Sequence, residues 1–372
     1  MSRKIILRML LTLAATLSVA GWCASAQSIT SAAKRVFVNG KWVTVEQAVK
    51  EKPVVPKDTK APSKPAPSLR MSTATERTAA EKEATARAER MSTLPNYSTS
   101  EDKALGDYLY NCVGFLSDTL CAGRGTGTRG AVEASAFVAR EFEAAGLSKL
   151  GGTWFHSFDA SGKTGHNVVG MIPGTKDRYV VVFAYFDALG ELGGKPYPGA
   201  DSNASGVAAL TSLAYSLPKN PTIGVILVAL DAHNVSMAGS QKLYKELSGK
   251  QIQLVVNIDI IGSTLAPVSS AHPEFLMALG GSRYSQSLAK ANEKTGLSLY
   301  FDYYYSRDFT DLFYRRISDQ KPFLDHGIPA VMFTSGITMN TNKVTDTIDT
   351  LDFPVYVKRV RLISNWISSY VR

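Results

Sequence analysis

The sequence predicts an α/β domain over residues 101–372, with a mixed, mostly parallel central sheet flanked by helices. Two observations carry this prediction. Short apolar, β-branched runs alternate with longer segments of helical character, which is typical of strands buried on both faces and separated by helices. Aspartate, histidine and asparagine follow directly after three of these runs. Because functional loops of open α/β sheets lie beyond the carboxyl ends of the strands, we expect a functional site at that edge.

Each element of the domain follows from its own stretch of sequence. Strands are expected at residues 179–186, 222–230, 253–258 and 330–333. Helices are expected at residues 102–115, 204–217, 238–247, 284–295 and 354–370. Aromatic residues crowd the segment before Ser318, and we expect them to form the packing face of a strand rather than a wall for a ligand.

Residues 1–26 have the pattern of a secretory signal peptide. Basic residues precede the apolar run 9–22, and Ala24-Ser25-Ala26 provides a small-residue cleavage site. The run is too short to remain as a membrane span, so no stable span is expected. Cys23 follows Trp22, where a lipoprotein signal needs a small residue, so simple export is favoured. The expected location is periplasmic or extracellular.

Residues 27–100 do not have the composition of a packed domain. Residues 36–45 alternate around Asn39-Gly40 and predict a small hairpin. A Pro- and Lys-rich linker at 52–69 and a charged helix at 74–91 follow. We therefore expect a flexible N-terminal segment before the folded domain.

The net charge of +9 lies outside the predicted domain. Residues 1–100 hold 16 Lys and Arg against 7 Asp and Glu, whereas residues 101–372 hold 25 of each kind. A neutral domain with a basic tail gives little support to nucleic-acid binding, and none is expected.

Cys112 and Cys121 are the two cysteines that remain after signal cleavage. In an oxidising compartment they can form a bridge that ties the helix at 102–115 to the glycine-rich stretch after it. Two free buried thiols are the alternative, and the sequence leaves both open.

Five motifs in a fixed order carry a family resemblance. They are Tyr185–Asp187 (YFD), Pro198–Gly206 (PGADSNASG), Asp231–Asn234 (DAHN), Asn257–Gly262 (NIDIIG) and Ser318–Phe323 (SDQKPF), followed by Gly327–Phe333 (GIPAVMF). Ser117–Thr128 and Val344–Asp349 match the opening and closing stretches of the same pattern. Together they resemble the zinc aminopeptidases of peptidase family M28, in which the motifs carry the ligands of two zinc ions.

The resemblance implies a role for each matched position. Asp201 falls on the carboxylate that bridges the two metals, and Asp259 falls on a second metal-binding aspartate. Four of the six chemical positions have changed type: Tyr185 and Gln320 replace ligand histidines, Asn234 replaces a ligand glutamate, and His233 replaces the general-base glutamate. Asp187 matches the residue that orients the lost histidine, and we expect it to hydrogen-bond the Asp201 loop instead.

These changes predict weak or absent metal binding. Zinc prefers imidazole and thiolate ligands supplemented by carboxylates, and Tyr185 is a phenol with a reference pKa of about 10. Without a metal to acidify water and polarise a carbonyl, His233 has no activated water to deprotonate. No cofactor is expected, and His233 is more readily explained as a polar residue at a strand end than as a base. Asp201 and Asp259 can likewise be held by backbone amides or by a basic residue such as Arg307, Arg315, Arg316 or Lys321.

The leading hypothesis is an exported, catalytically degenerate aminopeptidase-like protein that binds a peptide or protein partner through the old active-site cleft. The main alternative is an active metallopeptidase with one atypical metal, zinc in the first instance, held by Tyr185, Asp201 and Asp259 with His233 as base. The oxygen donors among these residues would also accept calcium or magnesium. A third possibility is a purely structural envelope protein positioned by its N-terminal linker.

Overall fold

The computed structural model describes residues 35–38, 41–44, 97–304 and 306–372. It divides into two units, Met1–Thr93 and Leu94–Arg372. In the first, β1 (Arg35–Val38) pairs antiparallel with β2 (Lys41–Thr44), which confirms the predicted hairpin. The signal peptide, the linker at 52–69 and the helix at 74–91 lie outside the described residues and stay predictions.

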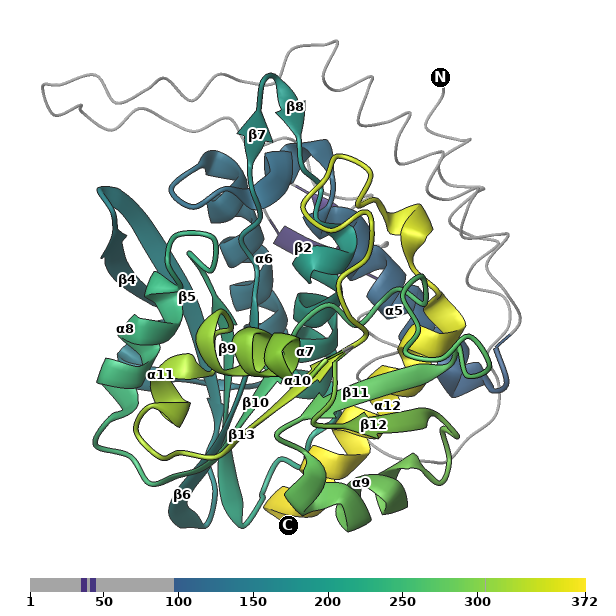
Figure 1. The fold of residues 1–372 in the computed structure, drawn as a ribbon. Coiled ribbons are helices and arrows are strands. Elements are labelled where there is room, and N and C mark those ends of the chain that lie inside the picture. Colours follow the sequence, from purple (N-terminus) through teal and green to yellow (C-terminus); the bar gives the residue numbers. More distant parts are fainter. Residues whose placement is uncertain (1–34, 39–40, 45–96, 305) are drawn as a thin grey trace, which may run out of the picture. The chain divides into compact units, whose positions relative to one another are not determined.

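A nine-stranded mixed sheet forms the centre of the second unit (Figure 1). The strand order is β12-β11-β13-β10-β6-β9-β5-β3, with β4 also paired to β5. The strands are β3 (Ser148–Lys149), β4 (Phe155–Ala160), β5 (Lys163–Ile172), β6 (Lys176–Tyr185), β9 (Ile223–Leu230), β10 (Ile252–Ile258), β11 (Phe275–Leu279), β12 (Ser298–Phe301) and β13 (Ala330–Thr334). The four central strands β9, β6, β10 and β13 are parallel. This confirms the predicted fold class.

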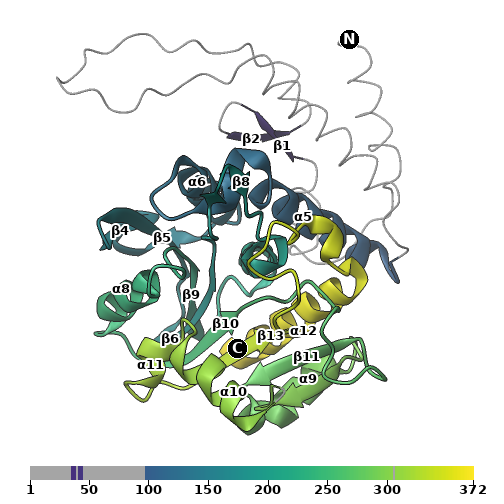
Figure 2. The same cartoon turned by 45° about the horizontal axis from the view of Figure 1, so that its top comes forward.

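Helices cover both faces of this sheet (Figure 2). They are α5 (Ser100–Leu116), α6 (Arg129–Ala144), α7 (Ser205–Ser216), α8 (Ala238–Leu247), α9 (Ser285–Asn292), α10 (Arg307–Asp311), α11 (Lys321–Leu324) and α12 (Phe353–Val371). Helix α7 packs on β6, β9 and β10, with α5, α6 and α12 beside it. On the opposite face, Leu243 and Leu247 of α8 and Phe323 of α11 pack on alternate residues of β6 and β9. None of the described helices is long and apolar enough to cross a bilayer.

Short elements occupy the connections. They are η2 (Thr119–Arg124), η3 (Leu150–Gly152), the β7–β8 hairpin (Glu191–Leu192 and Lys195–Pro196), η4 (Ala200–Ala204), η5 (Ser282–Tyr284), η6 (Leu312–Arg316) and η7 (Ile348–Thr350). The β7–β8 hairpin projects from the domain in the view of Figure 1. The aromatic segment before Ser318 was expected to be a strand, but it forms α10 and η6. Tyr304, Phe309 and Phe313 of this segment pack together, so their role in packing is as expected.

Cys112 and Cys121 are both buried thiols, and no disulfide joins them. Cys112 lies in α5, and the Cys121 Sγ in η2 contacts the Phe115 carbonyl oxygen at 3.4 Å. The structure therefore favours the second of the two alternatives that the sequence left open.

We expect these thiols to react only when the domain unfolds, because burial hides both sulfurs from reagents. In a Cys23→Ser chain, a thiol-specific reagent should modify no cysteine under native conditions and both cysteines in denaturant without reductant. If no thiol reacted in denaturant, the two residues would be bridged and this finding would be wrong.

Candidate functional site

The site forms where three parallel strands end side by side. Strands β6, β9 and β10 end at Tyr185, Leu230 and Ile258, so the segments that follow them meet at one edge of the sheet. Segment η4 is fastened to this edge through Asn203, whose Nδ2 donates to the Ile258 carbonyl at 2.9 Å and whose Oδ1 accepts from Ile260 N at 2.9 Å. The sequence motifs are therefore neighbours in space.

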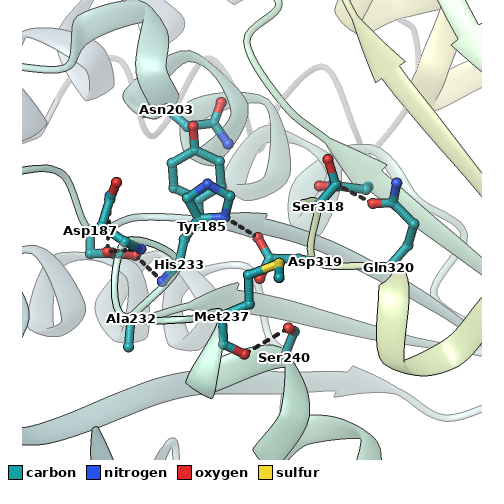
Figure 3. Close-up of polar contacts among 12 residues, drawn as sticks. Tyr185, Asp187, Asn203, Ala232, His233, Met237, Ser240, Ser318, Asp319 and Gln320 are labelled. Atoms are coloured by element: carbon teal, nitrogen blue, oxygen red, sulfur yellow. Dashed lines mark hydrogen bonds and ion pairs between the residues drawn. The ribbon is translucent and has the colours of Figure 1, made fainter. Parts of the chain in front are cut away.

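Tyr185, His233 and Asp319 form the centre of the site (Figure 3). The rings of Tyr185 and His233 stack, with centroids 3.9 Å apart and planes inclined by 10°. The His233 Nδ1 lies 2.7 Å from the Asp319 Oδ2. Asp319 is buried, whereas 20% of the His233 side chain is exposed, so the imidazole is the member of this group that meets solvent.

This pairing determines the charge of His233. Burial alone would lower the pKa of the imidazole, but the carboxylate of Asp319, and to a smaller extent those of Asp259 and Asp187, outweigh burial and raise the pKa to about 9. At neutral pH His233 is therefore a cation. A protonated imidazole cannot serve as a general base, and this argues against the catalytic role considered for it.

Asp259 and Asp319 each keep one oxygen that has no hydrogen-bond partner in the described part of the chain. The Oδ1 atoms of both carboxylates are buried and accept no hydrogen bond from the described residues. Burial raises the pKa of Asp259, His233 lowers it and Asp319 raises it again, with a net pKa of about 7. The carboxyl groups of Asp259 and Asp319 and the imidazolium of His233 thus act on one another, and each of the two carboxyl groups has one oxygen without a hydrogen bond from the described residues.

Asp187 fastens the loop that follows β9. Its Oδ1 accepts from His233 N at 2.8 Å, and its Oδ2 accepts from Asn234 N at 3.0 Å and from Asn234 Nδ2 at 3.2 Å. The expectation that Asp187 would bind the Asp201 loop is therefore wrong. The loop after β9 approaches more closely because β6 and β9 are adjacent parallel strands.

Asp201 does not face the centre of the site. Its Oδ1 accepts from Gly262 N at 2.7 Å and from Ser205 Oγ at 3.0 Å, and its Oδ2 accepts from Ser263 N at 3.2 Å. Of the two expectations for Asp201, this geometry is that of a carboxylate held by backbone amides and not that of a bridging metal ligand. The next residue, Ser202, points to the centre instead, with its Oγ 3.1 Å from the Tyr185 hydroxyl.

Asp346 performs the function that we had expected of Asp187. Its carboxylate accepts from Asp201 N at 2.8 Å and from Ser202 N at 3.0 Å, so it fixes the backbone of η4 from the far end of the chain. Burial, together with the charge of Asp201, raises the pKa of Asp346 to about 6.

The two amides at predicted ligand positions are already occupied. Gln320 is buried, with its Oε1 accepting from Asn257 Nδ2 at 2.8 Å and its Nε2 donating to the Tyr314 carbonyl at 2.6 Å. Asn234 is exposed and donates to Asp187. Burial raises the pKa of the Tyr185 phenol well above 10, so it stays neutral. In the described part of the chain, no three His, Cys, Asp or Glu residues are grouped to hold a metal. This set of donors does not suit zinc.

The basic residues that we considered as counter-charges lie elsewhere. Arg315 and Arg316 pair with Asp311, and Lys321 pairs with Asp325. Instead, Arg359 of α12 is the cation that lowers the pKa of Asp201, although burial dominates and raises it. Asp201 and Arg359 lie 158 residues apart in the sequence, so an analysis of motifs does not pair them.

The loops of the site carry unusual backbone conformations. Ala232, Ser236, Met237 and Ile260 have φ values of 60°, 56°, 54° and 56°, in the left-handed region that favours glycine. Ile260 is β-branched, which makes its conformation a costly one. Such residues gather at functional sites, where the surrounding structure holds them in place.

Comparison with known proteins agrees with the fold. The model of "Peptidase family M28" matches residues 167–367. The LapA aminopeptidase of Legionella pneumophila superposes with a TM-score of 0.57 at 16% identity, covering 78% of this chain and 75% of that chain. An aminopeptidase from Aneurinibacillus sp. strain AM-1 has a TM-score of 0.55 at 15% identity, with 72% and 94% covered. A glutaminyl cyclase of Bacteroides thetaiotaomicron has a TM-score of 0.53 at 16% identity, with 74% and 99% covered.

A curated relative is the alkaline phosphatase isozyme conversion protein of Escherichia coli strain K12. It is 26% identical over 171 residues, which is 40% of this chain and 50% of that protein. The match thus spans about half the length of the relative. The structural likenesses at these identities establish the shared α/β fold.

We expect stability to fall between pH 7 and pH 9 because of His233. Its pKa is raised on folding, so its contribution is complete below about pH 6.5 and is lost as pH rises through 9; between pH 7 and 9 the loss is about 2 kcal/mol. Denaturant unfolding of His233→Gln should show a much smaller change over this range. His326→Gln, which removes an exposed histidine, should keep the wild-type slope. An unchanged slope in His233→Gln would contradict the assignment.

We also expect Ser202, and not Asp201, to be the position from which a metal ligand can be restored. A Tyr185→His, Ser202→Asp variant places a new imidazole and a new carboxylate beside Asp259, which gives three zinc ligands. By calorimetry it should bind zinc on the order of tenfold or more tightly than Tyr185→His alone, which retains Asp201. Equal affinities would show that Asp201 can turn to the site after all.

Proposed function

We propose that this chain, which belongs to peptidase family M28, is an exported, catalytically degenerate member of the family. It binds a peptide or protein partner through this site. The observation that carries the proposal is the group Tyr185, His233 and Asp319. A stacked tyrosine and a paired imidazolium stand where the sequence pattern places a ligand histidine and a general base. Export rests on the signal peptide predicted at residues 1–26.

The donors of the site support binding without a metal. Zinc would find one neutral phenol, two amides committed to other protein groups, and the carboxylate of Asp259. Zinc sites use imidazole nitrogen and thiolate sulfur. The one imidazole in this set, that of His233, is already paired with Asp319, and the set contains no thiolate. No step of hydrolysis is therefore assigned to a zinc-bound water.

The charge of the site indicates which end of a peptide it would take. Asp187, Asp259 and Asp319 surround one cation, His233. The free Oδ1 atoms of Asp259 and Asp319 are acceptors, and leaving a buried acceptor unpaired costs about 1–3 kcal/mol. An ammonium group carries a positive charge and three donors. A peptide with a free amino terminus is the ligand that best satisfies these two oxygens.

Access to the site supports the same ligand. His233 is half-buried and Asn234 beside it is exposed, so the loop after β9 is where a ligand would enter. An ammonium group at the end of an extended chain can reach two buried oxygens, whereas an internal peptide group cannot bring a charge to them.

The test compares a short peptide with a free amino terminus against the same peptide acetylated. We expect acetylation to weaken binding by about tenfold or more, because it removes the charge that Asp259 and Asp319 would meet. Asp259→Asn should weaken binding of the free peptide similarly and leave the acetylated one unchanged. Asp325→Asn, an exposed carboxylate paired with Lys321, is the matched control and should bind like wild type. Equal affinity for both peptides would contradict amine recognition.

Metal content decides between this proposal and an active metallopeptidase. Protein purified without chelator should hold no stoichiometric zinc, calcium or magnesium and should not cleave aminoacyl substrates. Stoichiometric metal together with chelator-sensitive cleavage would overturn the proposal in favour of a single atypical metal site that includes Asp259.

A further inference from the structure

Arg124 is a wholly buried cation that joins three separate stretches of chain. Its Nε donates to the Phe186 carbonyl at 2.6 Å, its Nη1 to the carbonyls of Pro198 (2.7 Å) and Leu116, and its Nη2 to the Gly199 carbonyl at 2.9 Å. Arg124 itself lies at a left-handed φ of 50°. Phe186 leads into the excursion that carries the β7–β8 hairpin, and Pro198 and Gly199 lead out of it.

The backbone around Arg124 fixes the same excursion. Gly190 N donates to the Gly123 carbonyl at 2.9 Å, and Ala188 N donates to the Arg124 carbonyl at 3.3 Å. A Cβ at Gly123 would lie 2.4 Å from the Gly190 carbonyl oxygen, so this contact requires glycine. The excursion is thus held at its root by both the side chain and the main chain of one loop.

Arg124 is also the buried counter-charge of two carboxylates that fix the site. Burial lowers the pKa of Arg124, while Asp346 and Asp187 are among the groups that raise it. Asp346 accepts from the amides of Asp201 and Ser202, and Asp187 accepts from those of His233 and Asn234. One cation therefore lies near both of the anions that hold the two loops of the site.

We propose that Arg124 is a positioning residue for the site, which acts by holding the two ends of the 187–199 excursion and by balancing the charges of Asp187 and Asp346. By its hydrogen bonds to the two ends of the excursion it sets the distance between Tyr185 and Ser202, which lie just before and just after it. By its charge it stabilises the two carboxylates whose hydrogen bonds hold the loops of Ser202 and His233. This role does not depend on which ligand the site takes.

Arg359 supplies a matched comparison on the other side of the site. It too is wholly buried and donates to backbone carbonyls only, those of Phe275, Ile261 and Ser263, at 2.8 to 2.9 Å. If burial of a guanidinium mattered only for global stability, substitutions of the two residues would have the same effects everywhere. The proposal predicts different local effects.

Amide hydrogen exchange of the full chain, without ligand, tests this. In Arg124→Lys, which keeps the charge but loses the branched donor geometry, exchange at the amides of Asp201, Ser202, His233 and Asn234 should be at least tenfold faster. Exchange at Gly262 and Ser263 should not change. In Arg359→Lys, exchange at Gly262 and Ser263 should be faster, and exchange at the amides of Asp201, Ser202, His233 and Asn234 should not change.

Two outcomes would overturn the proposal: uniform acceleration across the domain in Arg124→Lys, or unchanged exchange at the four amides. Arg124→Met, if it folds, should accelerate the same four amides further, because it also removes the counter-charge. Binding of the free-amine peptide should weaken in Arg124→Lys in parallel with exchange. If the exchange pattern appears but no variant or wild-type chain binds the peptide, the positioning role stands and the proposed function fails.

Discussion

The constraint on which the site depends is the attachment of each loop to its neighbour by a buried carboxylate that accepts backbone amides. Asp187 binds the loop after β9, Asp201 binds the loop after β10, and Asp346 binds η4. Hydrogen bonds to a charged group contribute about 1.5–3 kcal/mol each, and every one of these carboxylates receives at least two. Ions bound at a strand edge would join the same segments. Here the protein joins them with its own groups.

This arrangement has an electrostatic cost that the structure only partly offsets. Burial raises the pKa of Asp187 to about 6, that of Asp346 to about 6 and that of Asp259 to about 7. In each case burial is the largest cause and a different neighbouring carboxylate adds to it: Asp231 at Asp187, Asp201 at Asp346 and Asp319 at Asp259. His233 lowers the pKa of Asp259, and the raised pKa of His233 itself follows from Asp319 first and then from Asp259 and Asp187. The imidazolium is therefore a component of the acidic cluster and not an isolated remnant of catalysis.

The sequence predicted the fold and the edge at which the site lies, because strand and helix periodicities and motif order are local properties. It did not predict which of two adjacent residues, Asp201 or Ser202, points to the centre, since a loop gives no periodicity from which side-chain direction follows. Nor did it identify Asp346 or Arg124 as partners of the site. Their contacts cross long sequence separations, although both lie within the stretches that matched the family pattern. Paired charges of this kind are recognised only when the chain is folded.

The residues of the site depend on one another, and this supports the proposal of a binding site. A tyrosine at 185 fits because the imidazole at 233 offers a flat surface for stacking, and that imidazole fits because Asp319 accepts from it. A glutamate at 233 would bring a third carboxylate to Asp259 and Asp319, which without a metal would raise their mutual repulsion. Among the described residues, the buried carboxylate oxygens without a hydrogen bond belong to Asp259 and Asp319, whose charges act on each other and on His233. The amide Oδ1 of Asn257 also has no hydrogen-bond partner among these residues. Burying the two carboxylate oxygens without a hydrogen-bond partner costs free energy. A cationic ligand that donates to both of them would remove this cost.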